Sequence, residues 1–264
     1  MKVISALIDF TETSKKAVQY AAWIAKHEGA KVNLVHIEAS KSDNQEEIEN
    51  RLIDFSGIED QNVPYTVSLG DGNYLKKIPT LLQRNQADFV VIGTHGVKGI
   101  FQTLFGANVL ILVQSLGISA LVVQDHTPAP PSKTRSILFP LAPHHDFNVK
   151  IDQTAYWAKS WDARVDVFCL IKGDDSLPDN IAHNLELTKT TFTKEGVRFV
   201  TTLQDSKVYS VGYSKEITAY AEDKGFDLLA IMSKNSEENQ YFGNVDKTNL
   251  ILNPKGIPVL CIAK

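Results

Sequence analysis

The sequence predicts an α/β protein with two tandem, open, mostly parallel five-stranded sheets, each covered by helices on both faces. Two observations predict this class. Apolar strand-like runs alternate with segments of helical periodicity, and this alternation occurs twice along the 264 residues. Alternating strands and helices favour right-handed βαβ crossovers, which bury a parallel sheet on both faces. The strand order expected in each sheet is 3-2-1-4-5.

The first copy contains five strand-like runs separated by four helical segments. The first helix is expected to begin at Thr11 or Ser14 and to end at Gly29, because hydroxyl side chains cap helix starts and glycine favours helix ends. The second helix covers residues 43–55. The third is marked by Leu75, Ile78 and Leu82, and the fourth by Val109, Leu110, Val113 and Leu116. The expected strands are Val3 to Ile8, Lys31 to Ile37, Val63 to Leu69, Asp88 to Gly93 and Ala120 to Gln124.

A proline-rich segment separates the two copies. Three prolines within residues 128–131 cannot continue a strand or a helix, so the segment is interpreted as a semi-rigid linker. The predicted domains are therefore residues 1–126 and 135–264, joined by a linker over 127–134.

The second copy repeats the order of the first, which indicates an internal duplication. Asp88 and Asp227 take the same place before matching strands. The alternative to a duplication is a coincidental likeness between two unrelated α/β domains. The matching segments are Ser136 to Leu141 with Val3 to Ile8, Tyr156 to Ile171 with Ala22 to Ile37, Phe226 to Ile231 with Ala87 to Ile92, and Ile257 to Ile262 with Ile118 to Val123.

Composition narrows the classes of partner. The net charge of −4 gives no electrostatic reason to expect nucleic-acid or anionic-membrane binding, and no apolar run reaches the length of a membrane span. The N-terminal apolar stretch is too short for a signal peptide. Cys169 and Cys261 lie in apolar strand-like runs and are interpreted as reduced core thiols. We therefore expect a soluble cytoplasmic protein.

The segment from Gly93 to Val109 is the strongest candidate for a ligand-binding loop. Gly93 ends a strand, Gly96 follows, and Gly106, Ala107 and Asn108 open a helix. Glycine allows backbone N–H groups to approach a phosphate closely, and a helix start supplies unpaired N–H groups. Residues 89–124 contain no Asp or Glu. The alternative is a glycine-rich turn that only packs.

Asp9 directly follows the first strand, at the carboxyl edge where open α/β sheets bind ligands. With strand order 3-2-1-4-5, strands 1 and 4 are neighbours, so Asp9 and Gly93 are expected to flank one crevice. The alternative for Asp9 is a helix cap for the segment that begins near Thr11.

Asp9, the spacing Gly93-x2-Gly96-x9-Gly106 and the closing strand Ala120 to Gln124 together resemble the ATP-binding subclass of universal stress proteins. The resemblance extends over the whole chain as two copies. It implies a Rossmann-like fold of the adenine nucleotide alpha hydrolase type and binding of ATP, with or without Mg²⁺, in the first copy. It also implies a pseudo-dimer within the chain, formed through the last strand of each copy, and leaves a homodimer open.

The resemblance implies roles for individual residues. Asp9 would contact the ribose or adenine and Ile37 would meet the adenine through its backbone. His95 and Gly96 would lie along the phosphates with Gly93. The terminal phosphates would be anchored by Gly106, Ala107 and Asn108, and the neighbouring site residues carried over are Leu7, Ile8, Ile92 and Val109. Ala107 stands where the family has Ser or Thr, so a hydroxyl contact is missing, which predicts an affinity lower by roughly tenfold to a hundredfold.

The second copy lacks this pattern. Ala142 stands at the place of Asp9, Met232 and Asn235 replace Gly93 and Gly96, and Glu237 and Glu238 enter the loop before Gly243. The second copy is therefore interpreted as a structural or dimerising partner. His144, His145 and Asp146 are interpreted as a solvated turn rather than a metal site.

Three functions follow from these patterns. The first is a stress-responsive regulatory protein that binds ATP in the first copy with little or no catalysis, because no general base is evident beside the glycine loop. The second is a slow ATPase or adenylyl-transfer enzyme assisted by His95 or Asp9. The third is a nucleotide-free interaction module that acts through dimerisation.

Overall fold

The computed structural model describes residues 1–264 except 41–43, 95–107, 133–135, 172–176, 206–212 and 235–239, and it does not describe the side chains of 240–243. The chain divides into two compact units. The first covers Met1–Pro130 and includes Ala263, and the second covers Pro131–Ile262 and includes Lys264.

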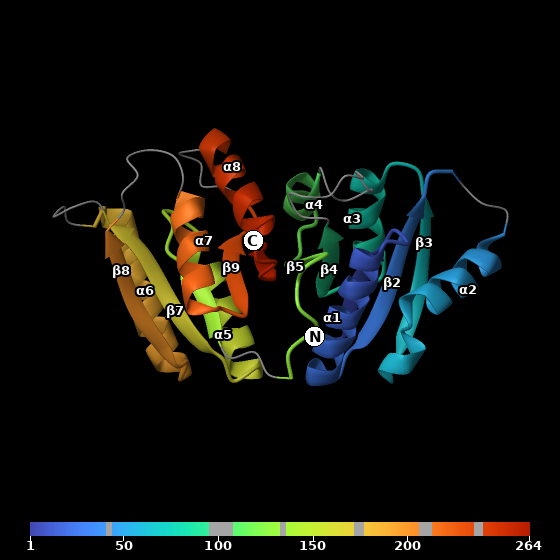
Figure 1. The fold of residues 1–264 in the computed structure, drawn as a ribbon, viewed down its shortest axis with the longest axis horizontal. Helices are drawn as coiled ribbons and strands as arrows, with labels where there is room; N and C mark the ends of the chain where they lie inside the picture. Colours follow the sequence, from blue (N-terminus) through green and yellow to red (C-terminus); the bar gives the residue numbers. More distant parts are fainter. Residues whose placement is uncertain (41–43, 95–107, 133–135, 172–176, 206–212, 235–239) are drawn as a thin grey trace. The chain divides into compact units, whose positions relative to one another are not determined.

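The first unit alternates strands and helices as the sequence predicts (Figure 1). A short 3₁₀ helix, Glu59–Gln61, precedes the third strand. The strands are β1 Val3–Ile8, β2 Lys31–Glu38, β3 Tyr65–Asp71, β4 Phe89–Thr94 and β5 Ala120–Gln124, and the helices are α1 Glu12–Glu28, α2 Gln45–Ser56, α3 Tyr74–Arg84 and α4 Val109–Ser115.

The five strands of this unit lie in the order β3-β2-β1-β4-β5, and every pairing is parallel. The predicted order 3-2-1-4-5 is therefore confirmed. Helix α1 packs with α2 and α3 packs with α4, as expected when crossovers on the two sides of β1 cover opposite faces. The central strands β1 and β4 are buried along their whole length.

Helix α1 begins at the predicted hydroxyl residue Thr11. The Thr11 side chain accepts a hydrogen bond from the Ser14 N–H, while the Ser14 side chain accepts one from the Thr11 N–H, which forms a capping box. The helix ends at Gly29, whose φ of 63° lies in the left-handed region that glycine adopts without strain.

The second unit has the same architecture. Its strands lie in the order β10-β9-β6-β7-β8, which is again 3-2-1-4-5 when counted within the unit, and all its pairings are parallel. Helix α5 packs with α6, and α7 with α8. The elements are β6 Ser136–Pro140, α5 Phe147–Ser160, β7 Arg164–Ile171, α6 Asp179–Glu195, β8 Phe199–Asp205, α7 Tyr213–Lys224, β9 Leu228–Met232, α8 Gln240–Ile251 and β10 Val259–Ile262.

Strand registers make the two units comparable residue by residue. Val3 pairs with Lys31 in β2, and Ser136 pairs with Arg164 in β7, so Val3 and Ser136 are equivalent. Asp88 and Asp227, which take matching places in the sequence, make equivalent contacts in the two units. Asp88 Oδ2 accepts a hydrogen bond from the Val3 N–H at 3.0 Å, and Asp227 Oδ2 accepts one from the Ser136 N–H at 3.0 Å.

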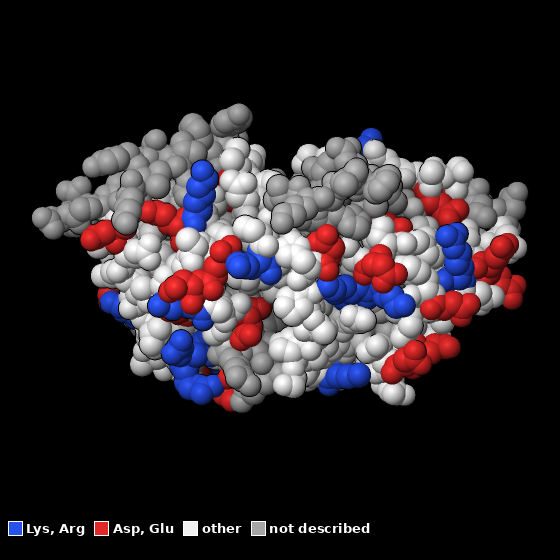
Figure 2. Space-filling view, in the orientation of Figure 1, with Lys and Arg blue, Asp and Glu red and all other residues white. Residues whose placement is uncertain are grey.

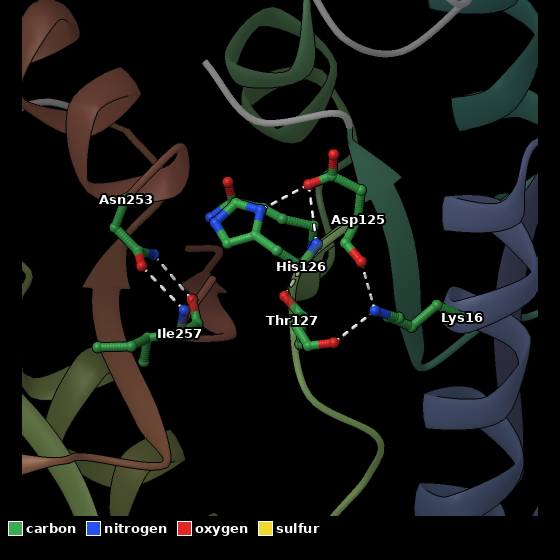
Figure 3. A network of polar contacts seen from close by, with 7 residues as sticks. Lys16, Asp125, His126, Thr127, Asn253 and Ile257 are labelled. Carbon is green, nitrogen blue, oxygen red and sulfur yellow. Dashed lines mark hydrogen bonds and ion pairs between the residues drawn. The ribbon is translucent and has the colours of Figure 1, made fainter. Parts of the chain in front are cut away.

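The chain that follows β5 is held against α1 in the first unit (Figure 3). Lys16 Nζ donates to the carbonyl oxygens of Asp125 and Thr127. The Thr127 hydroxyl accepts a hydrogen bond from the Gln124 N–H at 2.7 Å, and the Tyr20 hydroxyl donates to the carbonyl of Pro128. The first residues of the proline-rich segment are therefore fixed to their own unit.

Both cysteines are free and buried, as predicted. Burial raises the pKa of the Cys169 thiol to about 11 and that of the Cys261 thiol to about 12, so both stay protonated at neutral pH. Among the described residues, no helix is long and apolar enough to span a membrane.

Candidate functional site

The carboxyl edge of β1 and β4 is the candidate site in the first unit. β1 pairs with β2 on one side and with β4 on the other, so the residues that follow β1 lie between the two neighbouring strand ends. Asp9 follows β1 directly and is half-buried. The structure therefore brings Asp9 and the end of β4 to one edge of the sheet, which is the switch point at which open α/β sheets bind ligands.

The Asp9 carboxylate supports the start of α1. Its Oδ1 accepts a hydrogen bond from the Thr11 hydroxyl at 2.6 Å and a longer one from the Thr11 N–H at 3.3 Å. Asp9 is thus not the helix cap itself. It orients Thr11, which caps α1. Among the described residues, Oδ2 forms no hydrogen bond, so a second carboxylate oxygen remains for a ligand.

Gly93 is required by the packing of α1 on β4. A Cβ at Gly93 would lie 2.5 Å from the carbonyl oxygen of Thr13 and 3.0 Å from the backbone nitrogen of Ser14. Real Cβ atoms essentially never come this close to backbone atoms. The glycine therefore allows the first turn of α1 to lie against the end of β4, whether or not a phosphate also approaches there.

Five of the predicted site residues have buried side chains. Because these side chains fill the core, the residues could offer a ligand only their backbone groups, which is the kind of contact that the resemblance implies for Ile37. The five are Leu7, Ile8, Ile37, Ile92 and Val109, of which Ile37 is 4% exposed and the others 1% or less.

Asn108 is the residue immediately before α4. Its side chain makes no capping hydrogen bond to the helix and instead donates from Nδ2 to the Tyr74 hydroxyl at 2.9 Å. Tyr74 is the first residue of α3, so this contact ties the starts of α3 and α4 together. The Asn108 side chain is therefore already engaged in the described structure.

The other four residues of the predicted site, His95, Gly96, Gly106 and Ala107, lie outside the described residues. The predicted phosphate loop is therefore represented here by its two ends, Gly93 in β4 and Asn108 before α4.

An open hollow of about 960 Å³ is lined by residues of α2 and by Phe10, the residue that follows Asp9. Its apolar floor is formed by Phe10 and Phe55, whose ring centroids are 5.4 Å apart. Arg51 lies 4.1 Å above the Phe10 ring, and Glu46, Glu47 and Asp54 are among the polar residues that line the hollow.

Phe10 was not singled out from the sequence. It has a φ of 59°, which is uncommon for a bulky residue and is a form of backbone strain that clusters at functional sites. Its ring also contacts His36, whose Nδ1 donates to the carbonyl oxygen of Ile8. The signal in the sequence that could have identified Phe10 is its place directly after Asp9, the acid at the end of the strand.

The charges on the face shown in Figure 2 are mixed. Lys and Arg side chains lie among Asp and Glu side chains, and neither sign forms a continuous surface among the described residues of this face. In the described parts of the chain, no group of three or more His, Cys, Asp or Glu side chains is arranged to hold a metal ion.

Comparisons with known proteins agree with the fold. The chain is similar to the structure of a universal stress protein from Archaeoglobus fulgidus, with a TM-score of 0.72 and 12% identity over 99% of this chain and 98% of that one. It is also similar to a functionally unknown protein from Pseudomonas aeruginosa, with a TM-score of 0.69 and 13% identity over 100% of this chain and 92% of that one. At these identities the likeness establishes the fold alone.

No curated protein matches the sequence. Residues 1–124 match the Universal stress protein family. These residues contain β1 to β5 in the order that the resemblance implied, with Asp9 and Gly93 at the ends of neighbouring strands. In sequence and in strand order, residues 1–124 of this chain are therefore similar to the universal stress protein family.

Proposed function

We propose that the first unit binds an adenine nucleotide, ATP with or without Mg²⁺, at the carboxyl edge of β1 and β4. In this proposal the protein is a cytoplasmic stress-response regulator with little or no catalysis. The observation that supports it best is the position of Asp9, a half-buried carboxylate at the switch point of the sheet with one oxygen turned to no described partner. The similarity of residues 1–124 to the family supports it independently.

Charge suggests how the nucleotide is oriented. The hollow beside Phe10 is lined by Glu46, Glu47 and Asp54, which would repel a polyphosphate. Residues 89–124, which include β4 and the glycine loop, contain no acid. We therefore place the phosphates on the β4 side of Asp9, along the glycines, and the base and ribose on the β2 side near Ile37.

The proposal is tested by the ATP affinity of matched variants, measured by isothermal titration. Gly106→Val should block the approach of phosphate and abolish binding. Gly243→Val, the counterpart in the second unit, lies in α8 and should leave the affinity unchanged. Thermal melts verify that each variant is folded. If both variants lost ATP affinity equally, the proposal that the nucleotide binds in the first unit would be wrong.

A second pair of variants tests Asp9 itself. Asp9→Asn keeps an oxygen that can accept from the Thr11 hydroxyl but removes the charge, whereas Asp9→Ala removes both. We expect both variants to weaken ATP binding, and only Asp9→Ala to lower the melting temperature appreciably. Unchanged affinity in both variants would remove Asp9 from the site. No binding of millimolar ATP by the wild type would instead favour the nucleotide-free interaction module.

Turnover separates the regulatory function from the enzymatic one. A slow ATPase or adenylyl transferase would release product from ATP with the pure protein, and this activity would be lost in His95→Ala. The proposal expects no turnover above that of the same protein with Gly106→Val. A rate that depends on His95 would establish the enzyme instead.

A further inference from the structure

Two buried lysines lie at the carboxyl edge of β6 and β9 in the second unit. Lys150, from α5, donates from Nζ to the carbonyl oxygen of Pro140 at 2.5 Å. Lys247, from α8, donates from Nζ to the carbonyl oxygen of Met232 at 2.6 Å. These carbonyls belong to the last residues of β6 and β9, which are paired neighbours. The relative exposures of Lys150 and Lys247 are only 1% and 9%, respectively.

The two ammonium groups lie within each other's electrostatic influence. Burial lowers the pKa of Lys150 well below its usual value, and the positive charge of Lys247 lowers it further. Burial also lowers the pKa of Lys247 to about 8, although Cys261 and Asp246 act in the opposite direction. At neutral pH the edge therefore holds at least one buried positive charge.

Among the described residues, no carboxylate forms an ion pair with Lys150 or Lys247, although Asp246 favours the charged form of Lys247. Asp146, near the start of α5, forms an ion pair with Lys264 at 2.6 Å. Asp246, beside Lys247 in α8, accepts hydrogen bonds from the hydroxyl and the N–H of Ser214. A lysine ammonium has three donors, and each of the two lysines has one described acceptor. Buried charges are normally paired, so the donors that have no described acceptor are available to an anion.

Lys150 also lies over aromatic rings. Its Nζ is 4.1 Å from the ring centroid of Phe139 and 5.1 Å from that of Phe147. These contacts favour the charged form of Lys150 and so act against the effect of burial on its pKa. The rings also fix the direction in which the side chain extends, toward the end of β6.

His144 belongs to the same cluster. Burial, together with the charges of Lys247 and Lys150, lowers its pKa to about 3, although Asp146 acts in the opposite direction. The imidazole is therefore neutral at neutral pH and can donate one hydrogen bond to an anion. The segment does form a turn at His145 and Asp146, with His145 exposed, but His144 itself is half-buried and its carbonyl oxygen accepts a hydrogen bond from Asn184 Nδ2.

A comparison with the equivalent edge of the first unit explains how the side chains of Lys150 and Lys247 fit at this edge. By strand register, Phe147 is equivalent to Ser14, so α5 begins two residues later than α1. Met232 stands at the place of Gly93, where a side chain would collide with a helix start as close as that of α1. Ala142, at the place of Asp9, brings no acid to the edge.

We propose that this edge of the second unit binds a small oxyanion, a phosphate group, between the ammonium groups of Lys150 and Lys247 with His144 beside them. The bound charge would offset the repulsion between the two ammonium groups. The phosphate chemistry is shared by free inorganic phosphate and by the phosphates of a nucleotide, and the arms of the experiment distinguish these two sources.

The test follows the His144 imidazole signals by NMR during titration with inorganic phosphate, starting in phosphate-free buffer. Bound phosphate should raise the pKa of His144, because its charge offsets the two ammonium groups. Lys247→Met and Lys150→Met should each weaken phosphate binding by roughly tenfold or more, since each removes charge-assisted hydrogen bonds. Lys159→Met is the matched control, because Lys159 lies on the same helix, is exposed and pairs with Glu195.

Thermal melts provide a second measurement that does not depend on the NMR signals. Phosphate should raise the melting temperature of the wild type and of Lys159→Met, because a ligand that binds only the folded state stabilises it. The melting temperatures of Lys150→Met and Lys247→Met should not respond. Methionine fills a similar volume without charge, so both variants are expected to fold.

An ATP arm, run on Gly106→Val so that the first unit does not contribute, identifies the source. A response of His144 to ATP as well as phosphate assigns the site to nucleotide phosphates, and a response to phosphate alone assigns it to the free ion. If neither probe shifts the wild-type signals or melting temperature, the proposal is overturned. It is equally overturned if the shifts persist in both methionine variants, and in both cases the lysines serve the fold alone.

Discussion

Gly93 and Thr13 approach so closely that a single added carbon atom would not fit between them, since a Cβ on Gly93 would lie 2.5 Å from the Thr13 carbonyl oxygen. Because the atoms that it would meet belong to the helix backbone, they cannot rotate away. We expect Gly93→Ala to lower the free energy of unfolding by about 1–3 kcal/mol, as for other overpacked cores.

Gly70→Ala is the matched control for this prediction. Gly70 also lies in a strand, but its added Cβ would meet the methyl groups of Ile37 and Leu81, which end side chains that can move. Urea unfolding of the two variants should show the larger loss for Gly93→Ala. Equal losses would mean that contact with the α1 backbone does not decide the choice of glycine.

A second prediction concerns the start of α1. Thr11→Ala removes the acceptor for the Ser14 N–H and the partner of Asp9, and it should destabilise the first unit by about 1 kcal/mol. Thr11→Ser keeps the hydroxyl and should lose much less. Thermal melts in the absence of nucleotide measure this difference, and a serine variant as unstable as the alanine variant would argue against the capping role.

The fold was predictable because its signals are local and repeated. Buried strands such as Val3–Ile8 are continuous apolar runs, and Thr11 and Gly29 mark the ends of α1 through their own chemistry. The position of Asp9 at the carboxyl edge of the sheet was predictable for the same reason, because a lone acid directly after an apolar strand stands out.

The cluster around Lys150 and Lys247 was not predictable in this way. The two residues are far apart in the sequence, each lies on a helix whose pattern gives no hint of a buried charge, and only the sheet order brings them to one edge. The two reasons for Gly93 are equally hidden in the sequence, because a glycine in a phosphate loop and a glycine under a helix are the same letter.

Asp88 gives a third prediction, on acid stability. Partial burial would raise its pKa, but hydrogen bonds from the Lys2 and Val3 N–H groups and the nearby positive charges lower it below 3.8. A lowered carboxyl pKa stabilises the fold at neutral pH, and this contribution is lost as the pH falls below 3.8. Asp88→Asn should therefore be less stable than the wild type at neutral pH, with the difference shrinking in acid. A difference that is independent of pH in urea unfolding would contradict this.

His144 gives a fourth prediction. It also makes the stability rise with pH, but for a different physical reason than Asp88. Its pKa is about 3 in the folded protein against 6.5 ordinarily, so the unfolded chain binds a proton over a pH range in which the folded chain does not. Stability should rise with pH between about 3 and 6.5 because of this group. In phosphate-free buffer, His144→Asn should show a shallower pH dependence, and the exposed neighbour His145→Asn should not. Identical slopes in all three proteins would argue against a buried neutral imidazole.

The contact between Asp88 and Val3 also constrains how the chain assembles during synthesis. It joins residues 85 positions apart, and β1 lies between β2 and β4. When the ribosome has released only β1 to β3, one side of the fully buried strand β1 has no partner. The first sheet can therefore be completed only after Phe89 and the residues beyond it emerge. A pause in translation before that point would leave an apolar strand edge uncovered, and such edges promote aggregation.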